Sequence, residues 1–336
     1  MARRFLTACV LLCCLAAQVQ AARQGIAVYF DQDLFIPVVN QDRDYTMGVG
    51  VEFFTRETGI YPLEGLLEKV GGWLDVDRGN ESLQRSYLLG SVNYTPDDLS
   101  ASALLPNDRP YASVLFLANK WVLADSDTAI GVEAQAGLLG TYVAREVQRK
   151  VHAAWRDASN SSEPVDPRGW GNQISAGGEP TLRIRVARTD LMMHQPGLWD
   201  LARTADLSIG YQTNASVGLA ARAGRIGSPF WSLPYDPINR GNFVPAFGSD
   251  EIYIWTAGRA RAVAYDALLQ GQFRDSALTY GSEDLNHLVA DAGVGVTAAW
   301  QGLQLTLSAN MKTSEVNRGS DDRAQWWGGI YLSTRY

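Results

Sequence analysis

Apolar and polar residues alternate strictly along much of the chain. In Leu303–Lys312 every odd position carries an apolar side chain and every even position a polar one. Gly131–Leu139, Ala290–Trp300 and Asp206–Gln212 alternate in a similar way, and in the last of these Tyr211 is assigned to the apolar face. A period of two residues is typical of β-strands with one apolar and one polar face. The pattern therefore predicts an all-β fold.

Soluble β-sandwiches and membrane β-barrels both alternate in this way, and three features favour the barrel. The strands are about ten residues long, which is enough to cross a bilayer when tilted. Arg259 and Arg261 share a face between small residues, as side chains in a barrel lumen would. The segment 330–336 is an amphipathic strand ending on an aromatic residue, like the recognition signal of bacterial outer-membrane barrels. Because backbone groups in lipid must be paired, we expect a closed antiparallel transmembrane β-barrel of about 12 strands between Gln24 and Tyr336.

Two segments follow helical spacing instead. Gly59–Asp77 is expected to form a helix that caps one rim, and Tyr142–Asp157 repeats an apolar residue every four positions. Asn160–Arg168 and Gly227–Ser249 are rich in loop-forming residues. We expect all four to belong to the long outer loops of the barrel.

The first 21 residues predict a secretory signal peptide. Arg3 and Arg4 precede the apolar run Phe5–Ala17, and small residues at Val19 and Ala21 suit cleavage after Ala21. The barrel would then occupy 22–336 as a single domain. All three cysteines lie in the removed segment, so the mature chain is expected to lack disulfides and thiol nucleophiles.

Charge and motifs narrow the function. The net charge is −7, and this acidic balance excludes a typical nucleic-acid binder, which carries a basic excess. The sequence contains no HExxH, no GxSxG elbow and no P-loop. His194 and His287 are interpreted as solvated turn residues.

His152 has a more specific context. On the predicted helix it lies four residues after Gln148, so the two polar side chains share one face. Arg149 is among the arginines that flank this face and suits a phosphate. Spacing alone also fits a loop helix with a surface histidine.

A second group of polar residues is N-terminal. Asp31-Gln32-Asp33 and Asp42-Arg43-Asp44-Tyr45-Thr46 offer closely spaced carboxylates with a hydroxyl nearby. Such oxygen ligands are those that Ca²⁺ prefers. An acidic turn that pairs with Arg43 would produce the same pattern.

Seven motifs in chain order resemble the LpxR-type lipid A 3′-O-deacylases of the bacterial outer membrane. They are the acidic residues before Phe35, Asp42–Gly48, Tyr94-Thr95-Pro96-Asp97-Asp98, Asp108-Arg109-Pro110-Tyr111-Ala112, Glu146–His152, Gly169-Trp170-Gly171-Asn172-Gln173 and Thr313-Ser314-Glu315. Together they cover nearly all of the mature chain. The resemblance implies a twelve-stranded barrel with a Ca²⁺-dependent esterase site between the barrel wall and the outer-leaflet lipid.

The resemblance also assigns residue roles. It implies that His152 is the general base, Gln148 its neighbour, Thr46 the site hydroxyl and Asp33 the metal-side carboxylate, with Gln32 beside it. A histidine base and a cation for the oxyanion form a coherent route to ester hydrolysis without a covalent nucleophile.

The chain departs from the family pattern at two positions. Gln32 stands where the family has Asn, and Ala101 stands where a family member has a lysine. Arg109 is the expected replacement cation for substrate phosphate. The family's acidic residue after the histidine corresponds to Asp157 or Glu163, and we favour Glu163.

The sequence therefore predicts an outer-membrane carboxylic ester hydrolase that acts on lipid A of lipopolysaccharide with Ca²⁺ as cofactor. Zn²⁺ is the alternative metal, since an imidazole would tolerate it. A catalytically silent barrel, structural or channel-forming, and an esterase acting on phospholipid are the alternative functions. The sequence identifies no protein partner.

Overall fold

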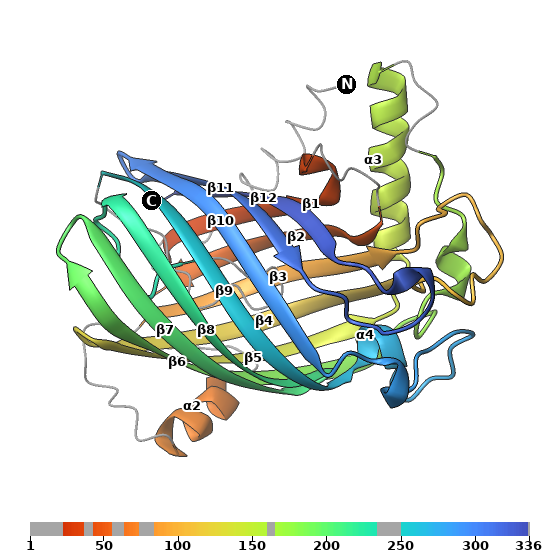
Figure 1. Ribbon diagram of the computed structural model, residues 1–336, viewed down its shortest axis with the longest axis horizontal. Helices are drawn as coiled ribbons and strands as arrows, with labels where there is room; N and C mark the ends of the chain where they lie inside the picture. Colours follow the sequence, from red (N-terminus) through yellow and green to blue (C-terminus); the bar gives the residue numbers. More distant parts are fainter. Residues whose placement is uncertain are drawn as a thin grey trace.

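The computed structural model describes residues 23–36, 43–55, 64–73, 84–159, 165–233 and 250–334 (Figure 1). Twelve strands make up most of it. Their bounds are β1 Arg23–Gln32, β2 Asp44–Thr55, β3 Gln84–Thr95, β4 Ala112–Ala124, β5 Thr128–Leu139, β6 Glu179–Gln195, β7 Trp199–Gly210, β8 Gln212–Arg225, β9 Glu251–Asp266, β10 Leu288–Trp300, β11 Leu303–Lys312 and β12 Gln325–Thr334.

The strands form one closed antiparallel barrel in which each strand pairs with its sequence neighbours. Closure comes from β1 and β12, which pair from Ile26 with Thr334 to Gln32 with Gly328. Closure leaves no free edge, as a sheet in lipid requires. The predicted twelve-stranded barrel is therefore confirmed.

Apolar side chains of the alternating strands point outward and polar ones inward. On β11, Leu305 is 41% exposed whereas Thr306 is 1% exposed. Leu207 and Ile209 on β7 are likewise exposed, but Tyr211 is buried in the turn after Gly210, so its assignment to the apolar face was wrong. An apolar outer surface around a polar interior is the reverse of a soluble sandwich and is typical of a membrane barrel.

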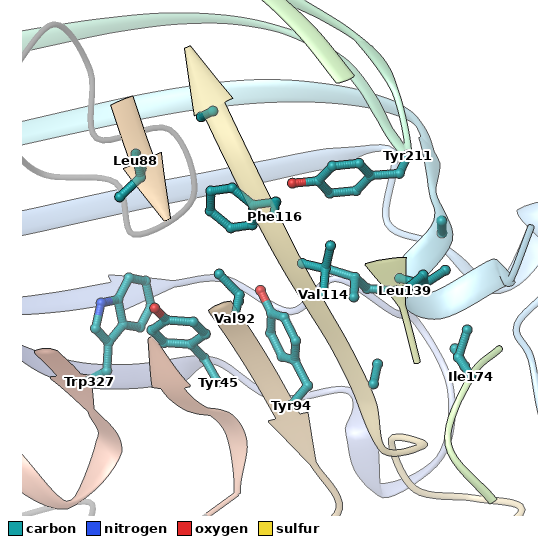
Figure 2. Close-up of a cluster of buried hydrophobic side chains, with 14 of the residues drawn as sticks. Tyr45, Leu88, Val92, Tyr94, Val114, Phe116, Leu139, Ile174, Tyr211 and Trp327 are labelled. Carbon is teal, nitrogen blue, oxygen red and sulfur yellow. The ribbon is translucent and has the colours of Figure 1, made fainter. Parts of the chain in front are cut away.

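Aromatic side chains fill one side of the lumen. The lumen cluster consists of Tyr29, Tyr45, Leu88, Val92, Tyr94, Val114, Phe116, Leu139, Ile174, Tyr211, Trp327 and Tyr331, together with small alanines and Leu268. Figure 2 shows rings from several strands pointing toward one another. Glycine makes room for them, since a Cβ at Gly50 would lie 2.1 Å from the Tyr29 ring. Large and small residues thus alternate to pack the interior.

Charged side chains occupy another part of the lumen and are paired. Arg183 bonds to Glu133 at 2.8 Å, and Arg259 and Arg261 both bond to Asp291 at 3.0 Å. The predicted lumen position of Arg259 and Arg261 is therefore confirmed. Pairing compensates the cost of removing these charges from water.

The two ends of the barrel differ. We call the end where β1 stops and β2 starts the loop rim, and the end where β1 starts and β12 stops the terminal rim. The loop rim carries the helical segments η1 (Asp33–Phe35), α3 (Val143–Ser159), η2 (Gly169–Asn172), α4 (Ala267–Gln270), η3 (Ser282–Asp284) and η4 (Gly319–Asp321). No helix among the described residues is long and apolar enough to cross a membrane.

The four segments predicted as outer loops do not all lie at the same end of the barrel. α3 confirms the helix expected at Tyr142–Asp157, at the loop rim. α2 (Glu64–Trp73) falls inside the expected Gly59–Asp77 helix, but it connects β2 to β3 at the other end of the barrel. The 227–249 segment likewise joins β8 to β9 at the terminal rim, and 160–164 and 234–249 lie outside the described residues.

α2 packs against the outside of the barrel wall rather than capping a rim. Its Leu67 is fully buried with Trp121, Val132 and Ala134 of β4 and β5. Val132 and Ala134 alternate with the lumen residues Glu133 and Gln135, so they face outward. Leu67 and Val70 therefore pack α2 on the wall, and Figure 1 shows this helix below β5 and β6.

Candidate active site at the loop rim

The motifs of the sequence analysis gather at the loop rim. Each lies at the end of an odd-numbered strand, at the start of an even-numbered strand, or in the loop between them. Segments as distant as Asp33 and Glu315 therefore reach the same end of the barrel. Because consecutive strands run antiparallel around the closed barrel, all of these strand ends and loops lie at the same rim.

The N-terminal group lies where β1, β2 and η1 meet. Thr46 sits at a β-bulge, because the pairing with β3 shifts between Tyr45 and Met47. Its Oγ1 lies 2.5 Å from Oγ1 of Thr95. Asp33 accepts a 2.6 Å hydrogen bond from the backbone N–H of Arg43.

Gln32 and Asp33 partly fit a hard cation. Both side chains are buried, and Gln32 Oε1 accepts no hydrogen bond from the described residues. Carboxylate and amide oxygens are ligands of Ca²⁺. Within the described ranges, no group of three or more His, Cys, Asp or Glu side chains could hold a metal. A Ca²⁺ ion held here would therefore need further oxygens from backbone, hydroxyl groups, water or substrate.

The second group lies on α3. Gln148 and His152 are one helical turn apart and only 4% and 2% exposed. Trp170 of η2 donates a 2.8 Å hydrogen bond from Nε1 to Gln148 Oε1. The ring of Trp170 packs on Tyr111 at 4.7 Å between centroids. The helix therefore turns a polar face toward the protein.

The contact of His152 defines its tautomer. Nδ1 lies 2.8 Å from the carbonyl oxygen of Val165. A carbonyl only accepts, so Nδ1 carries the hydrogen and Nε2 of the neutral ring has a lone pair. That is the form a general base requires. His194 and His287 are exposed, in line with their interpretation as solvated residues.

The apolar stripe of α3 faces away from the protein. Tyr142, Val143, Val147 and Trp155 are exposed although the helix buries Gln148 and His152. In Figure 1, α3 projects beyond the barrel wall and lies across the barrel axis. An exposed apolar face on a helix at this level suits contact with a lipid leaflet.

The loop Pro96–Tyr111 connects the two groups. Arg43 bonds to Asp97 in this loop at 2.7 Å. Leu99 of the same loop packs with Tyr111, Ala144 and Trp170. The described contacts between the Asp33 side and the His152 side of the rim run through this segment.

Arg109 lies inside the rim rather than at an open surface. It is 1% exposed, bonds to Glu315 at 3.0 Å, and its guanidinium lies 4.0 Å from the centre of the Tyr94 ring. The buried carboxylate already pairs with this charge, and the expected substrate-binding role of Arg109 stays a prediction. Arg149, by contrast, is half-exposed on α3 and only 3.4 Å from Asp166.

Of the other predicted positions, Ala101 lines a small cavity of about 20 Å³ together with Arg109, Tyr111 and Gly169. Asp157 is exposed at the end of α3. Glu163 lies outside the described residues.

Sequence reasoning missed a buried ionic network beneath the rim loops. Glu315 accepts from Arg109 and from Lys312 at 2.8 Å, and Arg323 bonds to Asp44 and Asp108 at 2.8 and 3.0 Å. Burial would raise the pKa of Glu315, but Lys312 and Arg109 hold it well below its usual range.

Asp321 belongs to the same network, but its pKa is raised, whereas that of Glu315 is lowered. Burial raises the pKa of Asp321 to about 7, Asp44 adds to this, and Arg109 and Arg323 oppose it. Tyr280 donates a 3.0 Å hydrogen bond to its Oδ2. The sequence motifs that contain Asp44, Asp108-Arg109 and Glu315 include members of this network, but they did not indicate that these residues pair.

Comparisons with known proteins agree with the fold. The family model described as outer membrane protein LpxR matches residues 5–336. The structure of LpxR from Salmonella typhimurium aligns with a TM-score of 0.68 and 15% identity, over 93% of this chain and all of that one. The β domain of the Bordetella autotransporter BrkA aligns with a TM-score of 0.42 and 9% identity, over 94% of this chain and 99% of that one. None of the curated proteins compared matches the chain.

Proposed function

Because the chain belongs to the LpxR family of outer-membrane proteins, we propose that it is an esterase that removes the 3′-linked acyl chain from lipid A in the outer leaflet. The observation that carries the proposal is the position of His152. It is a buried, tautomer-fixed imidazole on a helix whose outer face is apolar. A base in this position can act on an ester presented by the membrane.

In the proposed reaction, His152 Nε2 takes a proton from a water molecule, whose oxygen attacks the ester carbonyl. The tetrahedral intermediate collapses as the C–O bond to the sugar breaks. The protonated imidazole returns the proton to the departing sugar oxygen. The products are a free fatty acid and a sugar hydroxyl, so atoms and charges balance.

Other residues orient these groups. Gln148 and Trp170 fix the face of α3 that carries His152. Thr46 offers a hydroxyl that can donate to the substrate, and half-exposed Arg149 offers a guanidinium for a lipid A phosphate. Asp33 and Gln32 would hold Ca²⁺, which when bound supplies positive charge for the developing oxyanion.

The alternatives receive less support. A filled lumen cluster argues against a channel. Phospholipid carries similar esters and phosphates, so the chemistry of the site alone does not distinguish it from lipid A. A substrate panel with purified enzyme distinguishes the two.

Mass spectrometry of lipid A tests the proposal. Cells that express the wild type should lose the 3′-linked acyl group, whereas cells that express His152→Ala should keep it. His287→Ala, an exposed histidine of the same barrel, is the matched control and should act like the wild type. Heat-modifiability on gels verifies folding. Unchanged lipid A with folded wild-type protein and Ca²⁺ present would reject the proposal.

A further inference from the structure

A charged cluster interrupts the apolar outer wall. Arg188 of β6 and Arg203 of β7 both pair with Asp190, at 2.8 and 3.1 Å. The two arginine side chains are 62% and 63% exposed, and they alternate with lumen residues, so they point away from the barrel. Thr128 donates a hydrogen bond to Asp190 at 3.2 Å. The exposed Asp125 of the β4–β5 turn, whose pKa backbone hydrogen bonds lower, also lies close enough to Arg188 for the arginine to lower its pKa.

The cluster lies toward the terminal rim. Arg203 is four residues from Trp199 on β7, and Trp199 and Trp300 are exposed tryptophans at the terminal ends of their strands. Asp190 pairs in register with Thr128, the first residue of β5, so the cluster lies beside the β4–β5 turn at the terminal rim. A long arginine side chain can extend its guanidinium from this position toward the headgroups. The headgroups concerned belong to the leaflet at the terminal rim.

A groove of about 820 Å³ adjoins the cluster on the outer wall. Its lining includes Arg188 and Arg203 together with Ala205, Leu219, Gly258 and Ala260. The small residues hollow the wall between larger apolar neighbours. This volume falls within the range of about 300–1,000 Å³ that is typical of small-molecule sites.

We propose that this groove is a binding site for a glycerophospholipid of the leaflet at the terminal rim. The phosphodiester pairs with Arg188 and Arg203, and one acyl chain lies along Ala205, Gly258 and Ala260. Each arginine reaches Asp190 through its Nε, so its terminal Nη groups can donate charge-assisted bonds to phosphate oxygens. The site faces the leaflet opposite α3, so it is independent of the proposed esterase activity.

The charge of the cluster disfavours a second copy of the chain as the occupant. A two-fold interface centred here would bring the exposed guanidiniums of Arg188 and Arg203 of one copy against those of the other. Like charges facing each other in lipid repel strongly. An anionic amphiphile matches both the charge and the apolar groove.

Two variants test the site by different routes. Arg188→Gln with Arg203→Gln removes the phosphate ligands. Gly258→Leu fills the groove, and there is room for it because the nearest atom to a Cβ there is the Asp291 backbone oxygen at 3.9 Å. Arg225→Gln and Ala262→Leu are matched controls, since both residues are exposed and neither lines the groove.

Native mass spectrometry of the full, delipidated protein titrated with phosphatidylglycerol provides the measurement. The wild type and controls should retain one lipid, and each groove variant should bind it at least tenfold more weakly. Diacylglycerol, which lacks the phosphate, should not be retained. Equal retention by a folded groove variant would overturn the proposal, as would equal retention of diacylglycerol. If the wild type forms a dimer that either groove variant dissociates, the proposal is also overturned. The groove is then an interface with a second copy of the chain.

Discussion

The indole Nε1 of Trp170 donates a 2.8 Å hydrogen bond to Oε1 of Gln148, four residues before His152 on α3. This contact ties a short 3₁₀ turn to the helix that carries the proposed base. Trp170 itself is buried against Tyr111. The position of the imidazole therefore depends on an aromatic residue that takes no part in the chemistry.

Trp170→Phe should lower kcat for acyl release about tenfold and leave KM nearly unchanged. Phenylalanine keeps the ring but loses the bond to Gln148, so α3 is held less precisely, and small misplacements of a base are costly. Kinetics with purified enzyme and lipid A provide the test. Trp326→Phe, an exposed tryptophan of β12, is the control. Full activity in the Trp170 variant would remove this residue from the positioning role.

Asp33→Asn should raise the Ca²⁺ concentration for half-maximal activity about tenfold or more. The variant keeps the size of the side chain but removes the negative charge that would hold the cation. Chelation of Ca²⁺ should likewise abolish the activity of the wild type. A Ca²⁺-dependent shift of Tm gives a second readout. Asp98→Asn, an exposed carboxylate in the Pro96–Tyr111 loop, should behave like the wild type.

Glu315→Gln should destabilise the folded barrel by ~3–5 kcal/mol, because it leaves Arg109 and Lys312 buried without their carboxylate. The pKa of Glu315 is lowered in the folded state. Its contribution is therefore present above the unfolded pKa and lost as the pH falls below it. Urea unfolding at several acidic pH values should show this loss in the wild type and not in the variant. Glu283→Gln, an exposed acid at the same rim, is the control.

Asp321→Asn should stabilise the protein above pH 7. Burial raises the pKa of Asp321 to about 7, so the folded state binds a proton that the unfolded state has released. That contribution is present at low pH and lost as the pH rises through about 7. Each pH unit across this interval changes the stability by about 1.4 kcal/mol at most. Unfolding between pH 5 and 8 measures the slope, and exposed Asp322→Asn should retain it.

The wild-type barrel should give no steady conductance in planar bilayers. Tyr45 and Phe116 belong to the lumen cluster, and truncating both to alanine should open a path for ions. Leu117→Ala, on the outer face of β4, should remain closed. Ion flow through the wild type would mean that the cluster does not seal the lumen.

Much of the fold was predictable because lipid imposes a simple rule. Strands such as Leu303–Lys312 must place apolar residues outside and polar ones inside, so the period of two reveals both faces. The i, i+4 spacing of Gln148 and His152 likewise placed both on one helix face, and the structure buries that face.

The rest depends on contacts between residues far apart in sequence. Arg109 pairs with a carboxylate 206 residues later, and nothing local distinguishes a buried guanidinium from an exposed one. The place of α2 could not be predicted either, since its apolar stripe fits the wall and the rim equally well. To predict that Arg203 meets Asp190 on the outer wall, one must know the strand register, which depends on the whole barrel.

The packing of η1 on β12 has a consequence for biogenesis. Phe35 lies so close to Gly328 that a Cβ there would approach it to 2.5 Å, and β1 meets β12 only at the closing seam. Gln32 and Asp33 therefore lie beside β12 only in the closed barrel. A polypeptide that has not yet closed its barrel lacks the β12 side of the proposed metal site, so we expect it not to hydrolyse lipid before it is assembled.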